Sequence, residues 1–439
     1  MVRTFPAALI LCLTAMAPVT LPSQQSTLDK PSPEQVFAMA PFERWRSEGD
    51  IAQIPWKVRA INHGLTMHQR LLAHFEATIP GRELVARKKD GRILMFLEVT
   101  DSAGRPYRNF GVLDLTTFED GIRKHPVESV WEAFILPGDY KYVLAIWDEK
   151  TNERSFTHGS LRIDPVKNDP LPNAWEGLPA VDYWAPFKDG PDTMFHPDIA
   201  SRLNLPVGAQ RAIRYEIIAD LTPSDVFHGS TALYNHYLSD LLPTFKALSQ
   251  VRIPGAEMDA VAVDLRRQKV TFHQEGIDAI DWERLRPALD QENGPGMIDM
   301  RRLQGQENPV FLREHIAHLA AYQDESISNS AAKPLTVFVV LGSPMDSYHF
   351  PSLPPMEKGM EEDCVVYYVQ MEPFNPRRPI FGDVGKVQKM LKPLKTRSFM
   401  VRTPQDARHA LARILDEVGQ LAASTGLRSG LANVPQPTR

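Results

Sequence analysis

Three oxygen-bearing side chains stand at alternate positions directly after an apolar run in the segment RYEIIADLTPSD, residues 214–225. They are Asp220, Thr222 and Ser224. One carboxylate and two hydroxyls on a short loop could supply half of the octahedral oxygen shell that Mg²⁺ prefers. The same residue types also close Asx turns and cap helices, because their oxygens accept hydrogen bonds from nearby backbone N–H groups. Two interpretations therefore stay open: a metal site, or the structural turn that ends a buried strand.

A second group of reactive side chains lies in SPMDSYHF, residues 343–350, after another apolar run. It contains Ser343, Asp346, Ser347 and His349, residue types that serve in nucleophilic hydrolysis. A serine nucleophile needs a base within hydrogen-bonding reach, and closeness in a loop does not provide one. The Gly-x-Ser-x-Gly elbow of many hydrolases is absent from the chain. Hydrolysis at this loop is kept as an alternative hypothesis, and no catalytic residue is assigned.

Two histidines, His315 and His318, lie three residues apart in FLREHIAHLAAY. On a helix this spacing permits two metal ligands on one face. The zinc-protease patterns His-Glu-x-x-His and His-x-x-Glu-His are absent, however, and Phe311, His315 and Leu319 share one stripe of the helix. The pattern favours a partly buried pair at the protein surface.

Composition excludes several classes of protein. The chain has 439 residues, of which 43% are apolar and 23% charged, which is typical of globular domains. A formal charge of -5 gives no basic excess, so a surface that tracks nucleic-acid phosphates is not expected.

The N-terminal residues resemble a secretory signal. Arg3 precedes an apolar stretch over residues 5–17, and small and polar residues follow. We therefore expect export to the periplasm or the extracellular space. No later segment is long and apolar enough for a membrane helix, so no membrane span is expected in the mature chain. Signal removal would leave Cys364 as the single cysteine, which excludes an internal disulfide.

The pattern of apolar residues changes along the chain. Between residues 60 and 165, short apolar runs are separated by turn segments such as DSAGRP and PGD, which predicts an antiparallel β-sandwich of the immunoglobulin or fibronectin type. A proline-rich stretch follows. Beyond residue 211, strands alternate with helices, and LTVFVVLG and CVVYYVQM are apolar on both faces, as central parallel strands are. This alternation predicts a doubly wound α/β sheet.

The predicted organisation is a signal peptide at 1–23, a leader at 24–59, a β-sandwich domain at 60–165, a proline-rich linker at 166–210, a doubly wound α/β domain at 211–422 and a disordered tail at 423–439.

The second domain resembles a von Willebrand factor type A domain over about residues 211–420. The resemblance rests on the strand, the DLTPS segment, the long amphipathic helix, the strand pair and the later strands. The metal-ion-dependent adhesion motif of that family is Asp-x-Ser-x-Ser, and Asp220, Thr222 and Ser224 match it with the hydroxyl of threonine retained. A sandwich ahead of such a domain in an exported chain is also similar to poorly characterised exported proteins of acidobacteria.

The other ligand loops depart from the family pattern. Where the family has a threonine, the segment NGPGMIDMRRLQGQENPVF contains neither threonine nor serine. Where the family has an aspartate after its fourth strand, VVLGSPMDS has Ser343, with Asp346 three residues later. Asp299 or Asp346 could substitute only if their loops bend inward. The resemblance thus implies a degenerate motif, with Mg²⁺ as the cation if one binds.

No coherent catalytic constellation emerges from the sequence. We therefore expect a non-enzymatic, exported binding or scaffolding protein of the cell envelope. Its protein partner would contact the loops near Asp220, Gly342 and Asp299, with or without a cation. The alternatives are an envelope hydrolase that uses the Ser343–His349 loop and a purely structural module that binds nothing there.

Overall fold

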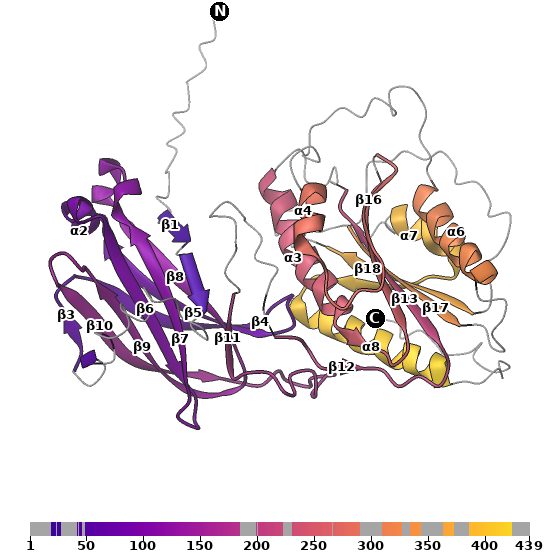
Figure 1. Cartoon of the computed structure of the whole chain (residues 1–439), viewed down its shortest axis with the longest axis horizontal. Coiled ribbons are helices and arrows are strands. Elements are labelled where there is room, and N and C mark those ends of the chain that lie inside the picture. The colour runs from indigo at the N-terminus through magenta and orange to yellow at the C-terminus, as the bar shows by residue number, and fades with distance from the viewer. Residues whose placement is uncertain are drawn as a thin grey trace, which may run out of the picture. The chain divides into compact units, whose positions relative to one another are not determined.

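A computed structural model describes two compact units in the chain (Figure 1). Unit 1 comprises Met1–Asn62, Ala73–Ile163 and Tyr183–Pro191, and unit 2 comprises His63–Leu72, Asp164–Asp182 and Asp192–Arg439. The residues that the structure describes are 19–22, 24–27, 42, 44–45, 49–184, 199, 201–222, 231–265, 267–289, 310–326, 334–343, 363–372 and 386–423.

The first half of the chain is rich in sheet. Its strands are β1 (Val19–Pro22), β2 (Gln24–Thr27), β3 (Ile51–Ala52), β4 (Lys57–Leu65), β5 (Leu71–Pro80), β6 (Arg92–Thr100), β7 (Pro106–Asp114), β8 (Pro126–Ile135), β9 (Gly138–Trp147), β10 (Arg154–Ile163) and β11 (Val181–Tyr183). Its short helices are α2 (Gly81–Ala86), η1 (Lys88–Asp90), η2 (Leu115–Thr117) and η3 (Asp120–Lys124).

These strands form two sheets in the described part of the chain. One has the order β1-β8-β5-β4, with β11 also paired to β8, and the other has the order β2-β7-β6-β9-β10-β3. The rings of Phe75 on β5 and Tyr142 on β9 meet edge to face with their centroids 5.2 Å apart, so the two sheets pack together at this point. Unit 1 is therefore a sheet-rich unit with a shared aromatic core.

Aspartate side chains close two hairpin turns of unit 1, the first of which lies in the predicted DSAGRP segment. Between β6 and β7, Asp101 Oδ1 accepts hydrogen bonds from the backbone N–H groups of Ala103 and Arg105 at 3.0 and 2.9 Å. Between β9 and β10, Asp148 Oδ1 accepts from Lys150 N at 3.0 Å. Asn152 adopts a φ of 58°, a left-handed conformation that asparagine tolerates better than most residues. Short polar side chains thus direct both reversals locally.

Residues from the expected signal and leader segments also contribute to unit 1. β1 runs parallel to β8, and β2 runs antiparallel to β7. Phe42 stacks on Phe96 at 5.4 Å, and the ring of Trp45 meets that of Trp147 at 5.2 Å. The described part of the leader therefore covers apolar residues of the six-stranded sheet.

Unit 2 contains parallel strands and longer helices. Its strands are β12 (Leu205–Pro206), β13 (Ile213–Asp220), β14 (Val251–Arg252), β15 (Glu257–Asp264), β16 (Lys269–Gln274), β17 (Leu335–Gly342), β18 (Cys364–Met371) and β19 (Arg397–Val401). Its helices are α3 (Thr231–Ser249), α4 (Trp282–Leu289), α6 (Phe311–Ser326), α7 (Lys386–Leu391), η6 (Lys392–Leu394) and α8 (Pro404–Ala423).

The main sheet of unit 2 has the order β16-β15-β13-β17-β18-β19. Only the β15–β16 pair is antiparallel in it; the other neighbours run parallel. When the six strands of this sheet are numbered 1 to 6 in chain order, their spatial order is 3-2-1-4-5-6. This is the arrangement of a doubly wound α/β sheet. Many doubly wound domains share the order, so it establishes the architecture and not the family.

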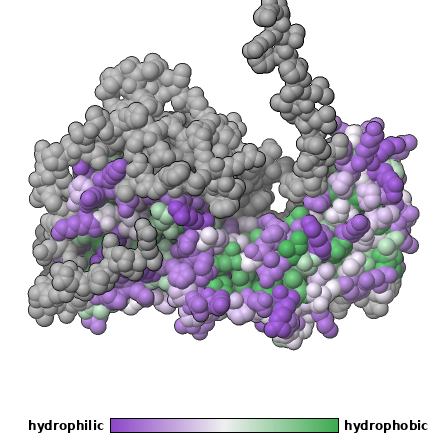
Figure 2. Space-filling view, turned by 180° about the vertical axis from the view of Figure 1, so that it is seen from behind, coloured by the Kyte–Doolittle hydropathy of each residue, from purple (hydrophilic) through white to green (hydrophobic). Residues whose placement is uncertain are grey.

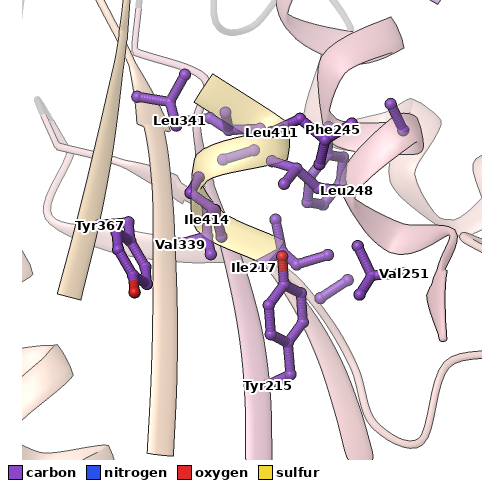
Figure 3. Packing of buried hydrophobic residues seen from close by; sticks show 14 of the residues in the cluster. Tyr215, Ile217, Phe245, Leu248, Val251, Val339, Leu341, Tyr367, Leu411 and Ile414 are labelled. Carbon is purple, nitrogen blue, oxygen red and sulfur yellow. The ribbon is translucent and has the colours of Figure 1, made fainter. Parts of the chain in front are cut away.

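Helices cover both faces of this sheet (Figure 1). On one face, Tyr215 and Ile217 of β13 pack with Phe245 of α3 and Ile414 of α8 (Figure 3). On the other face, strand residues such as Ile218 pack with α6 and α7. β17 is buried at every position, as its apolar LTVFVVLG segment predicted for a central parallel strand.

Large apolar side chains are almost entirely withdrawn from solvent in the described residues. Figure 2 shows hydrophilic residues interspersed with smaller groups of hydrophobic ones on one side of the molecule. Met400 on β19, with 49% of its surface exposed, is the exception among the large apolar residues that the structure describes. In the same residues, no helix combines the length and the apolar composition needed to cross a membrane.

Helix α8 begins with a capping box formed by Thr403 and Asp406. Asp406 N donates to Thr403 Oγ1 at 3.2 Å, and Thr403 N donates to Asp406 Oδ2 at 3.0 Å. The two residues therefore satisfy backbone donors reciprocally at the first turn.

A buried arginine on α8 holds the segment Asp164–Asp182 within unit 2. The guanidinium of Arg408, which is fully buried, donates to both oxygens of Asp169 at 2.5 and 2.7 Å. Its central carbon lies 4.6 Å from the centroid of the Trp175 ring, and Trp175 Nε1 donates to Gln69 O at 2.7 Å. Burial opposes ionisation of Asp169, yet the hydrogen bond from Arg408 helps to hold the pKa of Asp169 below its ordinary value. The proline-rich segment is thus attached by a paired, bidentate ion contact.

Replacing Arg408 with leucine is expected to lower the free energy of unfolding by about 3–5 kcal/mol, because Asp169 would keep a largely buried charge without its partner. Urea unfolding followed by tryptophan fluorescence measures the loss. Arg413→Ala on the same helix is the control: its side chain is 61% exposed and its ion pair with Glu417 should contribute less than about 1 kcal/mol. Equal losses in the two variants would contradict the assigned role of Arg408.

Candidate functional site

The candidate site lies at the carboxyl edge of the parallel sheet in unit 2. β13 lies between β15 and β17, and Ala219 is in register with Ala262 on one side and Leu341 on the other. The next residue of β13 is Asp220, its last, and it is fully buried. Ligands of open α/β sheets bind at this edge, because the strand ends and the connecting loops converge there.

One oxygen of Asp220 closes the turn after the strand. Asp220 Oδ1 accepts a hydrogen bond from Thr222 N at 3.0 Å and another from the Thr222 hydroxyl. The same hydroxyl accepts from Leu265 N at 2.6 Å. Tyr237 of α3 donates to the backbone carbonyl of Asp220 at 2.8 Å. These contacts fix the end of the strand. The turn interpretation therefore explains one of the two carboxylate oxygens of Asp220, namely Oδ1.

The other oxygen of Asp220 accepts no hydrogen bond from any residue that the structure describes. It faces Gly342 of β17, where a methyl group in place of the glycine hydrogen would lie 3.4 Å from Asp220 Oδ2. The next residue, Ser343, is also buried, and its hydroxyl has no hydrogen-bond partner in the described part of the chain. Tyr368 of β18 donates to the carbonyl of Ser343 at 3.1 Å and so fixes the first residue of the loop. Two buried oxygens at adjacent strand ends therefore have no hydrogen-bond partner within the described ranges.

Burial also changes the acidity of this site. It raises the pKa of Asp220 to about 7, a rise that the hydrogen bonds from Thr222 oppose and the nearby charge of Asp264 increases. Burial, with the charges of Asp220 and Glu372, raises the pKa of Tyr368 well above its ordinary value. A low-dielectric setting disfavours an isolated carboxylate, so a bound cation would stabilise the ionised form of Asp220.

The structure brings together only part of the predicted set. Asp220 and Thr222 are in contact, and Ser343 stands at the neighbouring strand end. The remaining predicted positions lie outside the described residues: Ser224, Asp299, Asp346, Ser347 and His349. The assignment of Asp220, Thr222 and Ser224 as metal ligands stays a prediction.

The histidine pair on α6 has a different environment. The ring of His315 stacks on that of Phe311, with centroids 6.0 Å apart and an interplanar angle of 12°. Burial, together with the charges of His273 and His318, lowers the pKa of His315. The partly buried location agrees with the surface pair that the helical pattern favoured.

A second buried acid on β13 was not singled out from the sequence. Glu216 is 1% exposed, and its Oε1 accepts no hydrogen bond from the described residues. Burial raises the pKa of Glu216 to about 8, Asp259 beside it on β15 adds to the rise, and Arg214 opposes it. Arg214 is already bonded to Asp259 at 3.1 Å. The available signal was the alternation in RYEIIAD, which places Glu216 and Asp220 on the same face of a buried strand.

Comparison with known proteins adds little to this site. No family model matches the chain, and no curated protein matches it. Among solved structures, the crystal structure of the ArnB paralog VWA2 from Sulfolobus acidocaldarius is similar at 11% sequence identity and a TM-score of 0.23. The alignment covers 63% of this chain and 49% of that chain, so it spans about half of the compared protein. A TM-score this low carries no structural argument, and the von Willebrand factor A assignment stays a prediction.

The buried acid Glu216 should make stability depend on pH. Its pKa is about 8 in the folded protein and 4.5 for the ordinary group, so the folded state binds more protons between these values. The contribution of Glu216 to stability should therefore be fully present below pH 4.5 and be lost progressively as the pH rises to about 8. Glu216→Gln removes this ionisation and should gain stability over the wild type across that range, by an amount on the order of 5 kcal/mol at pH 8.5.

Urea unfolding at intervals between pH 4 and pH 9 measures this difference. Glu275→Gln is the matched control, because the Glu275 side chain is 79% exposed. A Glu216→Gln variant whose stability runs parallel to that of the wild type at every pH would show that Glu216 is ionised in the folded protein.

Proposed function

We propose that this chain is an exported, non-enzymatic binding or scaffolding protein of the cell envelope. Its binding surface is the set of loops at the carboxyl edge of the unit 2 sheet, around Asp220, Gly342 and Ser343. The observation that carries the proposal is the Asp220 carboxylate, which is fully buried and has one oxygen with no hydrogen-bond partner among the described residues.

An unpaired buried carboxylate oxygen is expensive. Leaving a buried polar group without a partner costs about 1–3 kcal/mol, and more for a charged group. Such groups are rare in folded proteins and often mark functional positions, where an ion or a ligand supplies the missing interaction. The position of Asp220 at a strand end, next to the small residue Gly342, supports that explanation, because the edge is where ligands reach such sheets.

The oxygens at this edge suit a hard cation such as Mg²⁺. Asp220 Oδ2 and the Ser343 hydroxyl would hold it, with the second lone pair of the Thr222 hydroxyl also available. Asp264 at the end of β15 and Glu372 just after β18 are also buried carboxylates at this edge, but each is paired with an arginine, at 3.6 and 2.8 Å. Affinity would therefore be modest unless water or a partner carboxylate completed the shell. The cation would supply positive charge for an acidic group of the partner. The proposal that a cation assists partner binding rests on the resemblance to von Willebrand factor A domains.

The alternative hypotheses receive less support. Ser343 is 1% exposed, and within the described residues its hydroxyl has no hydrogen bond to a base that could activate it. A purely structural module explains Asp220 Oδ1, which closes the turn, but it leaves Oδ2 with no hydrogen-bond partner in the part of the chain that the structure describes.

Titration of Mg²⁺ and Mn²⁺ into the purified protein should give saturable binding by calorimetry. Asp220→Asn keeps the shape but removes the charge, so it should abolish binding. Asp416→Asn, an exposed position on α8, is the control and should bind as the wild type does. Thermal unfolding gives a second measurement, since a cation at 100 times its Kd stabilises by about 2.7 kcal/mol. If the wild-type protein gives no saturable binding heats, the proposal that a cation binds at this edge is wrong.

Partner binding is tested separately with the same two variants and with a third, Gly342→Val. Affinity isolation from an envelope fraction of the producing cells should recover a protein with the wild type and with Asp416→Asn. Recovery of that protein should fall about tenfold with Asp220→Asn or with Gly342→Val, which fills the space beside Asp220 Oδ2. Identical recovery with all four proteins would place any binding surface elsewhere and contradict the proposed function.

A further inference from the structure

A groove opens at the amino edge of the unit 2 sheet, at the opposite ends of the strands from Asp220. It has a volume of about 460 Å³, which is within the usual range for ligand sites. Its floor is apolar and consists of Val207, Val251, Ile253 and Ile277, all of which are buried. Met258, near the start of β15, forms part of its wall.

Backbone contacts hold the groove in shape. β12 and β14 pair in parallel, and Val207 N donates to Arg252 O at 2.9 Å. On the other side, Ile277 N donates to Met258 O at 2.7 Å. Two exposed prolines, Pro206 and Pro254, stiffen the walls because their φ angles are fixed. The groove is therefore formed before any partner arrives, which reduces the entropy lost on binding.

The charges at the rim do not balance. Arg202 is paired with Asp278, whose Oδ1 lies 2.7 Å from the Arg202 guanidinium. Arg252 is exposed and makes no ion pair with any residue that the structure describes. One positive charge thus remains beside an apolar floor. A partner that complements this surface carries an apolar side chain and, next to it, a carboxylate.

We propose that this groove binds an extended peptide segment of another protein, which inserts an aliphatic or aromatic side chain over Val251 and Ile253 and pairs a carboxylate with Arg252. A single unpaired cation is too little charge to follow a nucleic-acid backbone. The buried apolar floor supplies the affinity, and the ion pair selects acidic segments.

This surface is separate from the proposed site at the carboxyl edge. Met258 at the groove and Asp264 at the far end of β15 are six residues apart, and an extended strand rises about 3.3 Å per residue, which separates them by about 20 Å. The two edges can therefore be occupied at the same time, and the groove does not depend on the cation or on Asp220.

Selection from a library of random displayed heptapeptides tests the proposal on the full chain. The wild type should enrich peptides with a large apolar residue adjacent to Asp or Glu. Enrichment of these acidic peptides should fall at least tenfold with Arg252→Glu, and peptides with Lys or Arg in that position should replace them. Arg286→Glu, an equal change of charge at an exposed position on α4, should leave the enriched set unchanged.

Two further variants distinguish a failure of the groove proposal from a failure of the carboxyl-edge proposal. Asp220→Asn should enrich the same acidic peptides as the wild type, so loss of the carboxyl-edge site leaves this result intact. Selection with Ile253→Asp, which places a charge on the floor, should abolish enrichment. If the wild type enriches no acidic motif, or if Arg252→Glu enriches the same peptides, the groove is not an acidic-peptide site. Concentration-dependent dimerisation that Arg252→Glu abolishes, without peptide enrichment, would assign the groove to a second copy of the chain and overturn the proposal.

Discussion

Parallel pairing of β13 with both β15 and β17 is the constraint on which the rest of unit 2 depends. The strand is buried on both faces and on both edges, so its acids Glu216 and Asp220 are withdrawn from solvent. Helices must then cover each face, and every connection must return over the sheet before the next parallel strand begins. This topology delivers the ends of adjacent strands to one edge, where Asp220 and Ser343 stand without being near in sequence.

The same burial gives the two acids of β13 their unusual character. Asp220 and Glu216 lie on one face of the strand, and removal from water raises the pKa of each toward or above neutrality. They differ in what surrounds them. Asp220 has one oxygen occupied by Thr222 and stands at the carboxyl end of the strand, the edge where open α/β sheets bind ligands, whereas Glu216 lies further down the strand beside Asp259. The proposed binding role therefore concerns the first acid, and the expected effect on stability concerns the second.

Unit 2 has chemically different surfaces at its two edges. The carboxyl edge offers oxygens and suits a cation or an acidic partner that a cation attracts. The amino edge offers an apolar groove with Arg252 at its rim, an arginine that forms no ion pair with the residues that the structure describes. Because the strands between them are rigid and hydrogen-bonded, the spacing of the two surfaces is constant. Such an arrangement suits a scaffold, whose task is to hold partners at a fixed separation.

The sequence by itself determined the local features, because they depend on neighbouring residues: the apolar runs of the buried strands, the turns at Asp101 and Asp148, and the capping box of Thr403 and Asp406. Only the tertiary structure decided which distant groups meet. Arg408 pairs with Asp169 across 239 positions, and Gly342 of a separate strand lies beside Asp220. Periodicity reports which residues are buried, but pairing and desolvation depend on contacts between segments far apart in the chain.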